Sequence, residues 1–123
     1  MTKARLVYST YLGGSDVEDD IQIAVDHAGH AYLAGVTESP DFPEVNPIAG
    51  ANSSVFQAVL SRKGDALLYA TRLPAVPGDE FVFHGGGALA VGVTGDAYVS
   101  GWAFQAFVSR IESRKRCVTE QCW

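Results

Sequence analysis

The chain has 123 residues, a net charge of −5 and a hydrophobic content of 47%. This length suits one small domain, and the composition is typical of a globular protein rather than a disordered one. The acidic balance argues against nucleic acid and anionic membranes as partners, since both require clustered Lys and Arg side chains.

No apolar stretch of the sequence reaches the ~20 residues of a membrane-spanning helix. The first residues also lack the apolar core of a signal peptide. We therefore expect either a cytoplasmic protein or a piece of a longer one.

The composition favours strands, because the chain has thirteen glycines and many Val, Thr and Tyr residues. Period-2 alternation predicts strands at residues 5–12, 21–26, 30–36, 55–62, 66–73, 88–92, 96–102 and 104–111. Gly29, Gly64 and Gly95 stand where tight hairpins require a positive φ. The segment 37–54, which contains three prolines, is expected to be a long loop.

The chain carries nearly the same pattern twice. Ile23-Ala-Val-Asp-His-Ala-Gly-His-Ala-Tyr-Leu-Ala-Gly35 returns as Leu89-Ala-Val-Gly-Val-Thr-Gly-Asp-Ala-Tyr-Val-Ser-Gly101. Leu6-Val-Tyr-Ser-Thr-Tyr-Leu12 returns as Leu67-Leu-Tyr-Ala-Thr-Arg-Leu73, and Phe56-Gln-Ala-Val-Leu-Ser-Arg62 returns as Phe104-Gln-Ala-Phe-Val-Ser-Arg110. A repeat of this size stacks on neighbours to bury its apolar face, and four antiparallel strands per unit are typical of a propeller blade.

Three motifs in the first part of the chain resemble the bacterial SBBP repeat, which is the repeat of seven-bladed β-propellers. They are Tyr8-Ser-Thr-Tyr-Leu-Gly-Gly-Ser15 with its acidic continuation, the segment 23–37 that contains Ala-Tyr-Leu-Ala-Gly, and Ser39-Pro-Asp-Phe-Pro43. The resemblance covers residues 5–73 well and 88–111 more loosely, because Gly92 replaces Asp26 and the long loop is absent from the second unit. It implies a propeller scaffold with little defined chemistry, in a protein of the bacterial surface or of the extracellular space.

On this scheme residues 21–73 form one complete blade. Residues 88–111 supply three strands of a second blade, and the strand at 5–12, whose sequence is that of an outermost strand, completes it. Residues 113–123 form a tail of unknown structure. Because propellers typically have about four blades or more, we expect an all-β, partial β-propeller that is a fragment, a remnant or a subunit of a ring with further copies.

The acidic loop that follows the first predicted strand is a candidate calcium site. Asp16, Glu18, Asp19 and Asp20 carry the oxygen ligands that Ca²⁺ prefers. The alternative is a solvated acidic turn, since the spacing does not match an EF-hand and like charges are common in exposed loops. Apart from calcium, no cofactor is expected.

Asp41, Phe42 and Trp102 are candidate ligand-binding residues for a sugar or a peptide. The alternative for Phe42 is packing on the apolar edge of the blade, because burial of a Phe side chain stabilises by roughly 1.5–3 kcal/mol. The alternative for Trp102 is packing between blades. Cys117 and Cys122 make no zinc site by themselves, and both a disulfide and free thiols are open for them.

No nucleophile–base pair is found, and His84-Gly-Gly-Gly87 lacks the G-x-S-x-G turn of a hydrolase. We therefore expect a non-catalytic propeller module that serves as a scaffold or interaction surface, with a protein, a glycan or further blades as its partner. The alternatives are a carbohydrate-binding module and a fragment of a propeller hydrolase or lyase whose catalytic residues lie elsewhere.

Overall fold

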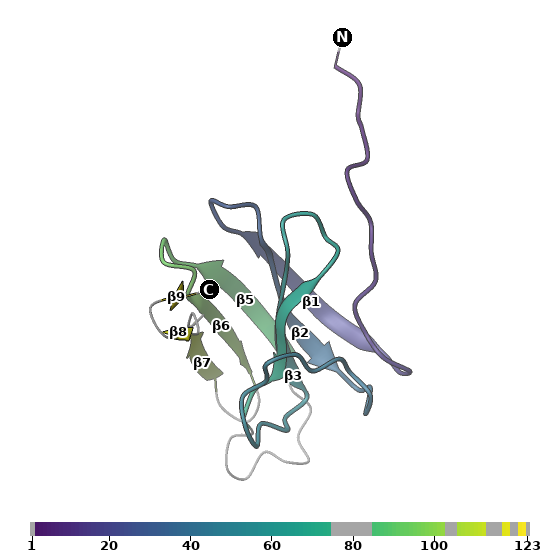
Figure 1. Cartoon of the computed structure of the whole chain (residues 1–123). Helices are drawn as coiled ribbons and strands as arrows, with labels where there is room; N and C mark the ends of the chain where they lie inside the picture. The colour runs from purple at the N-terminus through teal and green to yellow at the C-terminus, as the bar shows by residue number, and fades with distance from the viewer. Residues whose placement is uncertain (1, 75–84, 103–105, 113–116, 119–120, 123) are drawn as a thin grey trace.

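Two antiparallel β-sheets form the fold of the chain in this computed structural model (Figure 1). The structure describes residues 2–74, 85–102, 106–112, 117–118 and 121–122. The strands are β1 Glu18–Val25, β2 Ala31–Thr37, β3 Val55–Leu60, β4 Leu67–Arg72, β5 Gly85–Val91, β6 Ala97–Trp102, β7 Ala106–Ile111, β8 Cys117–Val118 and β9 Gln121–Cys122. The first sheet has the order β1-β2-β3-β4 and the second β5-β6-β7. Every element in the described residues is a strand, so the expected all-β class is confirmed.

Each sheet is a meander in which consecutive strands pair with one another. The backbone N–H groups of Gly29, Gly64 and Gly95 each donate to the carbonyl oxygen three residues earlier and close a tight turn. These glycines have φ angles of 87°, 71° and 86°. This left-handed conformation is what such a hairpin turn requires, so the prediction of the turns is confirmed.

The sequence repeat is also a structural repeat in the first two strands of each sheet. They pair in the same register, so that Tyr32 and Tyr98 occupy equivalent positions. The first strand of each sheet carries a β-bulge at the same repeat position, which is opposite Gly35 in β1 and opposite Gly101 in β5. The two units therefore share a local distortion as well as a strand order.

The third strand of the second sheet departs from the sequence repeat by three residues. Gly35 pairs with Phe56 in the first sheet, and the equivalent Gly101 pairs with Phe107. The sequence repeat instead aligns Phe56 with Phe104, and residues 104–105, the expected start of this strand, lie outside the described residues. The observed register places an aromatic residue opposite the glycine in both sheets.

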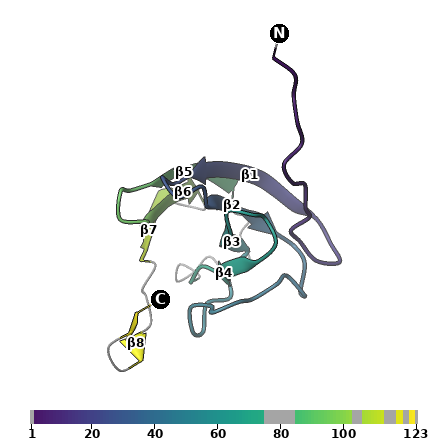
Figure 2. The ribbon, with the colours of Figure 1, turned by 45° about the horizontal axis from the view of Figure 1, so that its top comes forward.

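The two sheets pack face to face, with β1 and β2 against β5 (Figure 2). Apolar side chains from β2, β3, β6 and β7 meet between them, together with the residue that follows β4. The buried members of this shared core are Tyr32, Ala34, Val55, Val59, Leu73, Ala97, Val99 and Ile111. Removal of this apolar surface from water is the main favourable contribution to the stability of the fold.

The strand expected at residues 5–12 is not paired in this structure. These residues, the N-terminal arm, belong to no sheet, and toward its N-terminus the chain extends away from both sheets (Figure 1). A strand forms only where a sheet edge supplies hydrogen-bond partners, and the arm instead lies beside the first sheet, with the Tyr8 ring next to Gly64. The second sheet keeps three strands, and no closed sheet is present in the described residues.

The long loop between β2 and β3 covers the outer edge of the first sheet. Val45 and Ala70 of β4 exchange two backbone hydrogen bonds of 3.0 and 2.9 Å. The Ile48 N–H donates to the Thr71 hydroxyl at 2.9 Å. These contacts occupy part of the edge of β4, and edges that are covered in this way do not pair with other strands.

The tail expected at 113–123 contains a short hairpin, β8 and β9, in which Cys117 and Cys122 stand opposite each other in the ladder. Residues 113–116, 119–120 and 123 of this tail lie outside the described residues. In the part of the chain that the structure describes, there is no helix with the length and apolarity needed to cross a membrane.

We expect Gly35→Ala to destabilise the protein by about 1–3 kcal/mol, the usual cost of overpacking. A Cβ atom at Gly35 would lie 2.8 Å from the backbone oxygen of Asp19 and 3.0 Å from the Phe56 ring. Urea denaturation measures the change in the free energy of unfolding. The control is Gly92→Ala, since a Cβ atom there meets its nearest neighbours at 3.9 Å. Equal effects of the two substitutions would contradict the tight approach at Gly35.

Candidate functional site

Glu18, the first residue of β1, connects the loop before β1 to the loop after β2. One carboxylate oxygen of Glu18 accepts hydrogen bonds from the hydroxyls of Thr37 at 2.7 Å and Ser39 at 2.6 Å. The other oxygen accepts the backbone N–H of Gly14 at 3.1 Å. Both hydroxyl side chains belong to buried residues, and Ser39 is 0% exposed. Buried polar groups require partners within the protein, so Glu18 acts as a structural anchor.

Asp41 adds a second fastening between the same two loops. Its Oδ1 accepts both the backbone N–H of Ser15 at 2.8 Å and the Ser15 hydroxyl at 2.9 Å. The Ser39 hydroxyl oxygen also accepts the backbone N–H of Asp16 at 2.9 Å, and Arg72 donates to the Ser39 carbonyl oxygen. The Gly-Gly-Ser and Ser-Pro-Asp-Phe-Pro motifs therefore lie next to each other, and hydrogen bonds connect the two loops that contain them.

The charges of these carboxylates are compensated by donors of the protein itself. Burial favours the neutral form of Glu18, but the hydrogen bonds from Ser39, Thr37 and Gly14 together outweigh it, so its pKa lies below the ordinary value of 4.5. The two hydrogen bonds from Ser15 likewise lower the pKa of the Asp41 carboxyl. Both pKa values lie in the acid range, so both groups are ionised at neutral pH.

The four carboxylates considered for calcium do not converge on one point. Glu18 is turned toward the buried hydroxyls, Asp16 accepts the Val17 N–H, and Asp19 accepts the Asp20 N–H, the last two at 2.8 Å. All four are among the described residues. Within the described residues, no group of three or more His, Cys, Asp or Glu side chains could hold a metal ion. This arrangement gives the calcium hypothesis no support. Glu18, Asp19 and Asp20 belong to β1, and only Asp16 lies in the loop before it.

Phe42 is buried rather than presented to a ligand. It is 4% exposed, and its ring packs on Phe56 with centroids 4.5 Å apart and planes inclined by 39°. The Phe42 N–H donates to the Ser39 carbonyl oxygen at 3.2 Å, which turns the segment between the prolines back onto the sheet. Burial of the ring stabilises the fold, so the structure argues against ligand contact through Phe42 and fits the packing alternative. Asp41 is left as an exposed carboxylate bonded to Ser15.

Trp102 is exposed at the end of β6. Side chains alternate along a strand, so Trp102 shares the outer face of the second sheet with Tyr98, whereas Ala97 and Val99 face the core. Ligand binding by Trp102 and packing of Trp102 between blades both stay predictions.

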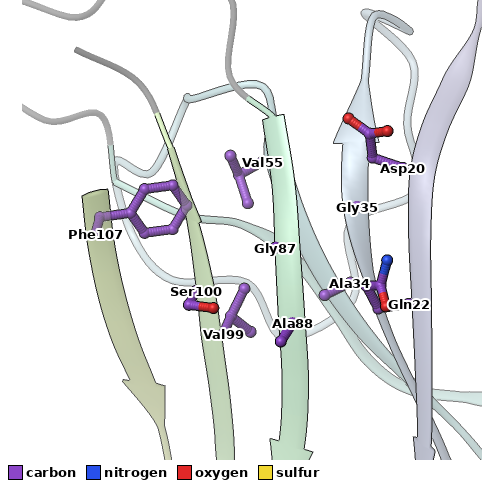
Figure 3. Close-up of a pocket in the computed structure, with 10 residues that line it drawn as sticks. All are labelled: Asp20, Gln22, Ala34, Gly35, Val55, Gly87, Ala88, Val99, Ser100 and Phe107. Carbon is purple, nitrogen blue, oxygen red and sulfur yellow. The ribbon is translucent and has the colours of Figure 1, made fainter. Parts of the chain in front are cut away.

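A small hollow lies between the two sheets (Figure 3). It is lined by small residues, among them Gly35, Gly87 and Ala88, with the polar side chains of Asp20 and Gln22 on its β1 side. Its volume is about 10 Å³, which is room for about one water molecule. The hollow is too small for a sugar ring or a peptide side chain.

A second polar cluster, not anticipated from the sequence, joins the turns of the two sheets. Asp26 Oδ1 accepts the backbone N–H groups of Ala28 and His30 at 2.9 Å. Asp26 Oδ2 lies 2.8 Å from His30 Nδ1 and accepts the Tyr32 hydroxyl at 3.1 Å. The same hydroxyl lies 3.3 Å from the Gly95 carbonyl oxygen of the second sheet. This cluster therefore connects the core tyrosine of one sheet to the turn of the other.

The pKa values of Asp26 and Tyr32 do not suit proton transfer at neutral pH. Burial favours the neutral form of Asp26, but the hydrogen bonds from His30 and Tyr32 outweigh it and lower its pKa below 3.8. Burial and the neighbouring Asp26 carboxylate raise the pKa of Tyr32 to about 12. A general acid or base works best with a pKa near the working pH, so Asp26 and Tyr32 fit a structural role.

The turn of the second sheet has an ion pair, between Arg110 and Asp96, at the equivalent place. Arg110 donates to Asp96 Oδ2 at 2.6 and 3.2 Å, and its guanidinium lies 6.0 Å from the centre of the Tyr98 ring. The charge of Arg110 on the outer face is thus already paired.

Comparison with known proteins finds no family model, no curated protein and no solved structure that matches the chain. The resemblance to SBBP repeats therefore stays a prediction that rests on the motifs, whose residues serve here to fasten loops.

We expect Ser39→Ala to lower the free energy of unfolding by about 1–3 kcal/mol, because two hydrogen bonds of a buried hydroxyl are lost, one of them to a carboxylate. The variant removes a donor from Glu18 and the acceptor of the Asp16 N–H. Urea denaturation measures the loss. Ser15→Ala, which removes an exposed hydroxyl of the same network, is the control and should change stability by about 0.5 kcal/mol or less. A neutral Ser39→Ala variant would show that the network does not hold the loops.

The lowered pKa of Glu18 predicts a specific acid sensitivity. Its carboxylate contributes stability that is complete above the unfolded-state pKa, near 4.5, and is lost as the pH falls through the lower folded-state pKa. Urea midpoints measured from about pH 7 down to about pH 3 should therefore fall less steeply for Glu18→Gln than for the parent. Glu38→Gln, at an exposed position in the neighbouring loop, should follow the parent curve, and identical curves for all three proteins would refute the linkage.

Proposed function

We propose that the chain is a non-catalytic module of the β-propeller type that serves as a scaffold or interaction surface, in a protein of the bacterial surface or of the extracellular space. The observation that carries the proposal is the repeated unit of structure. The two meander sheets share their register and bulge in their first two strands, and they bury one face against each other. Units of this kind are stabilised by neighbours on both sides.

The polar residues of the candidate site support the same function. The Glu18, Ser39 and Asp41 network and the Asp26 and Tyr32 cluster use their hydrogen-bonding groups to fasten loops and sheets. Side chains that are engaged in this way maintain the shape of a module rather than turn over a substrate.

The outer face of the second sheet supports an interaction role. Tyr98, Trp102 and Val108 are exposed there, and the register of β6 and β7 places them on one side of the sheet. Exposed apolar patches of this kind mark sites of protein–protein contact.

A glycan array and a panel of glycoside, ester and polysaccharide substrates test the proposal on the full chain. We expect no retained glycan and no turnover. Glycan binding that is lost in Trp102→Ala but kept in Val93→Ala, a second exposed position, would overturn the proposal in favour of a carbohydrate-binding module. Turnover by the purified chain would overturn it in favour of a propeller hydrolase or lyase.

A further inference from the structure

The last strand of the second sheet has an open edge in the part of the chain that the structure describes, whereas the last strand of the first sheet is covered. In the described residues β7 is the last strand of its sheet, at the place where the first sheet continues into β4. The edge of β4 itself is covered by Val45 and Ile48. An edge strand such as β7 presents unpaired N–H and C=O groups that pair readily with another strand.

The N-terminal arm has the sequence of the strand that the second sheet lacks. Leu6-Val-Tyr-Ser-Thr-Tyr-Leu12 repeats Leu67-Leu-Tyr-Ala-Thr-Arg-Leu73, which contains β4. The arm belongs to no sheet, and its Leu6, Val7 and Tyr11 side chains are exposed. A segment with strand sequence and exposed apolar side chains gains hydrogen bonds and apolar burial when it pairs with an edge.

The exposed faces of the two sheets are complementary. The sheets are related by the repeat, so each exposed face is equivalent to a face that packs in the contact between them. Leu89 and Val91 of β5 pack against the core between the sheets, whereas Ile23, at the position of Leu89 in the first sheet, is 65% exposed. Conversely, Tyr32 is 3% exposed in that contact, whereas the equivalent Tyr98 is 43% exposed. The exposed face of the first sheet therefore carries equivalents of the β5 residues that pack in the contact between the sheets. The exposed face of the second sheet carries the equivalent of Tyr32, which is buried in that contact.

We infer that copies of this chain associate head to tail, with the outer face of the second sheet of one copy packed on the outer face of the first sheet of the next. The N-terminal arm of that next copy adds to β7 as the fourth strand. The inference rests on the proposed scaffold function and names its partner, a second copy. Because the interface uses two different surfaces, successive copies repeat it until a ring closes.

The arm reaches another copy rather than its own β7. Gly14 and Ser15, which follow the arm, are hydrogen-bonded to Glu18 and Asp41. These bonds hold the C-terminal end of the arm on the first sheet. Both views show the arm and β7 on opposite sides of the molecule (Figures 1 and 2). An arm that is fastened on this side is placed to meet the second sheet of a neighbouring copy.

The pairing of β3 with β4 gives the register of the new ladder. Ala58 stands opposite Ala70 in the first sheet. Their equivalents are Ser109 in β7, placed by the register of β6 and β7, and Ser9 in the arm, placed by the sequence repeat. Ser9 of one copy therefore stands opposite Ser109 of another. The Arg110 charge near this edge is paired with Asp96, so its burial leaves no unpaired charge.

The same repeat assigns a hydrogen bond across the interface. The Tyr32 hydroxyl lies 3.3 Å from the Gly95 carbonyl oxygen within one chain. Its equivalent, the Tyr98 hydroxyl, meets the Gly29 carbonyl oxygen of the next copy.

Cysteine cross-linking tests this register directly. Ser9→Cys and Ser109→Cys are made separately in full chains that carry Cys117→Ser and Cys122→Ser, purified reduced, mixed and oxidised. Opposed strand residues have the Cα separation that a disulfide needs, so we expect a cross-linked pair of chains. Thr10→Cys mixed with Ser109→Cys is the matched control, since the neighbouring residue faces the other side of the sheet.

Two outcomes of this experiment overturn the inference. One is the absence of a cross-link, or equal cross-linking by the control pair. The other is a double variant, Ser9→Cys with Ser109→Cys, that closes within one chain while the mixed single variants do not link, because the arm would then complete its own sheet.

Sedimentation velocity of the full chain gives an independent readout. We expect a particle heavier than one copy, and its loss in Tyr98→Glu with strand content kept in circular dichroism. Val93→Glu, an exposed turn position, should keep the assembly. A parent chain that sediments as one copy, or a Tyr98→Glu variant that stays assembled, would overturn the inference. Neither result changes the glycan and turnover measurements, so the scaffold proposal fails or stands separately.

Discussion

The contact between the two sheets is the interaction on which the rest of the structure depends. Neither sheet has another place to bury the apolar face that contains Tyr32, Val59 or Val99, and these residues meet in one shared core. Two glycines at the bulges, Gly35 of β2 and Gly87 of β5, line the small hollow between the sheets. The Asp26 cluster then fixes the relative position of the sheets at one end, since a hydroxyl buried beside a carboxylate and a carbonyl oxygen has few alternative arrangements.

The local parts of the fold could be predicted from the sequence because they depend on local chemistry. Glycine at positive φ located the turns at Gly29, Gly64 and Gly95, and period-2 alternation located seven strands to within a few residues. The arm could not be placed, because its pattern specifies a strand but not the edge with which it pairs. The register of β7 was also hidden, since the sequence repeat aligns Phe104 with Phe56 whereas the ladder puts Phe107 in that position. Register depends on which face is buried, and that face is defined only by the other sheet.

The candidate site shows a similar division. Acidic and hydroxyl residues in two distant loops were visible in the sequence, but nothing there indicated that Glu18 would accept from both Thr37 and Ser39. Glu18 was therefore considered as a ligand for an ion, whereas it accepts hydrogen bonds from two buried hydroxyls. Asp26 gave a weak signal, as an acidic residue before a turn with a histidine four residues later, and its absence at Gly92 explains why only one of the two turns has this cluster.

The backbone bridge between Val45 and Ala70 makes the last strands of the two sheets different, because it covers the edge of β4. A sheet with two open edges can grow in both directions, and identical edges can pair with each other in a symmetric and unlimited way. Here one terminal strand is occupied by the loop of its own chain, with prolines beside it that donate no backbone hydrogen bond. Of the last strands of the two sheets, β4 and β7, only β7 is left uncovered in the described residues. A restriction of this kind separates an ordered, countable assembly from the open-ended stacking of strands that leads to fibres.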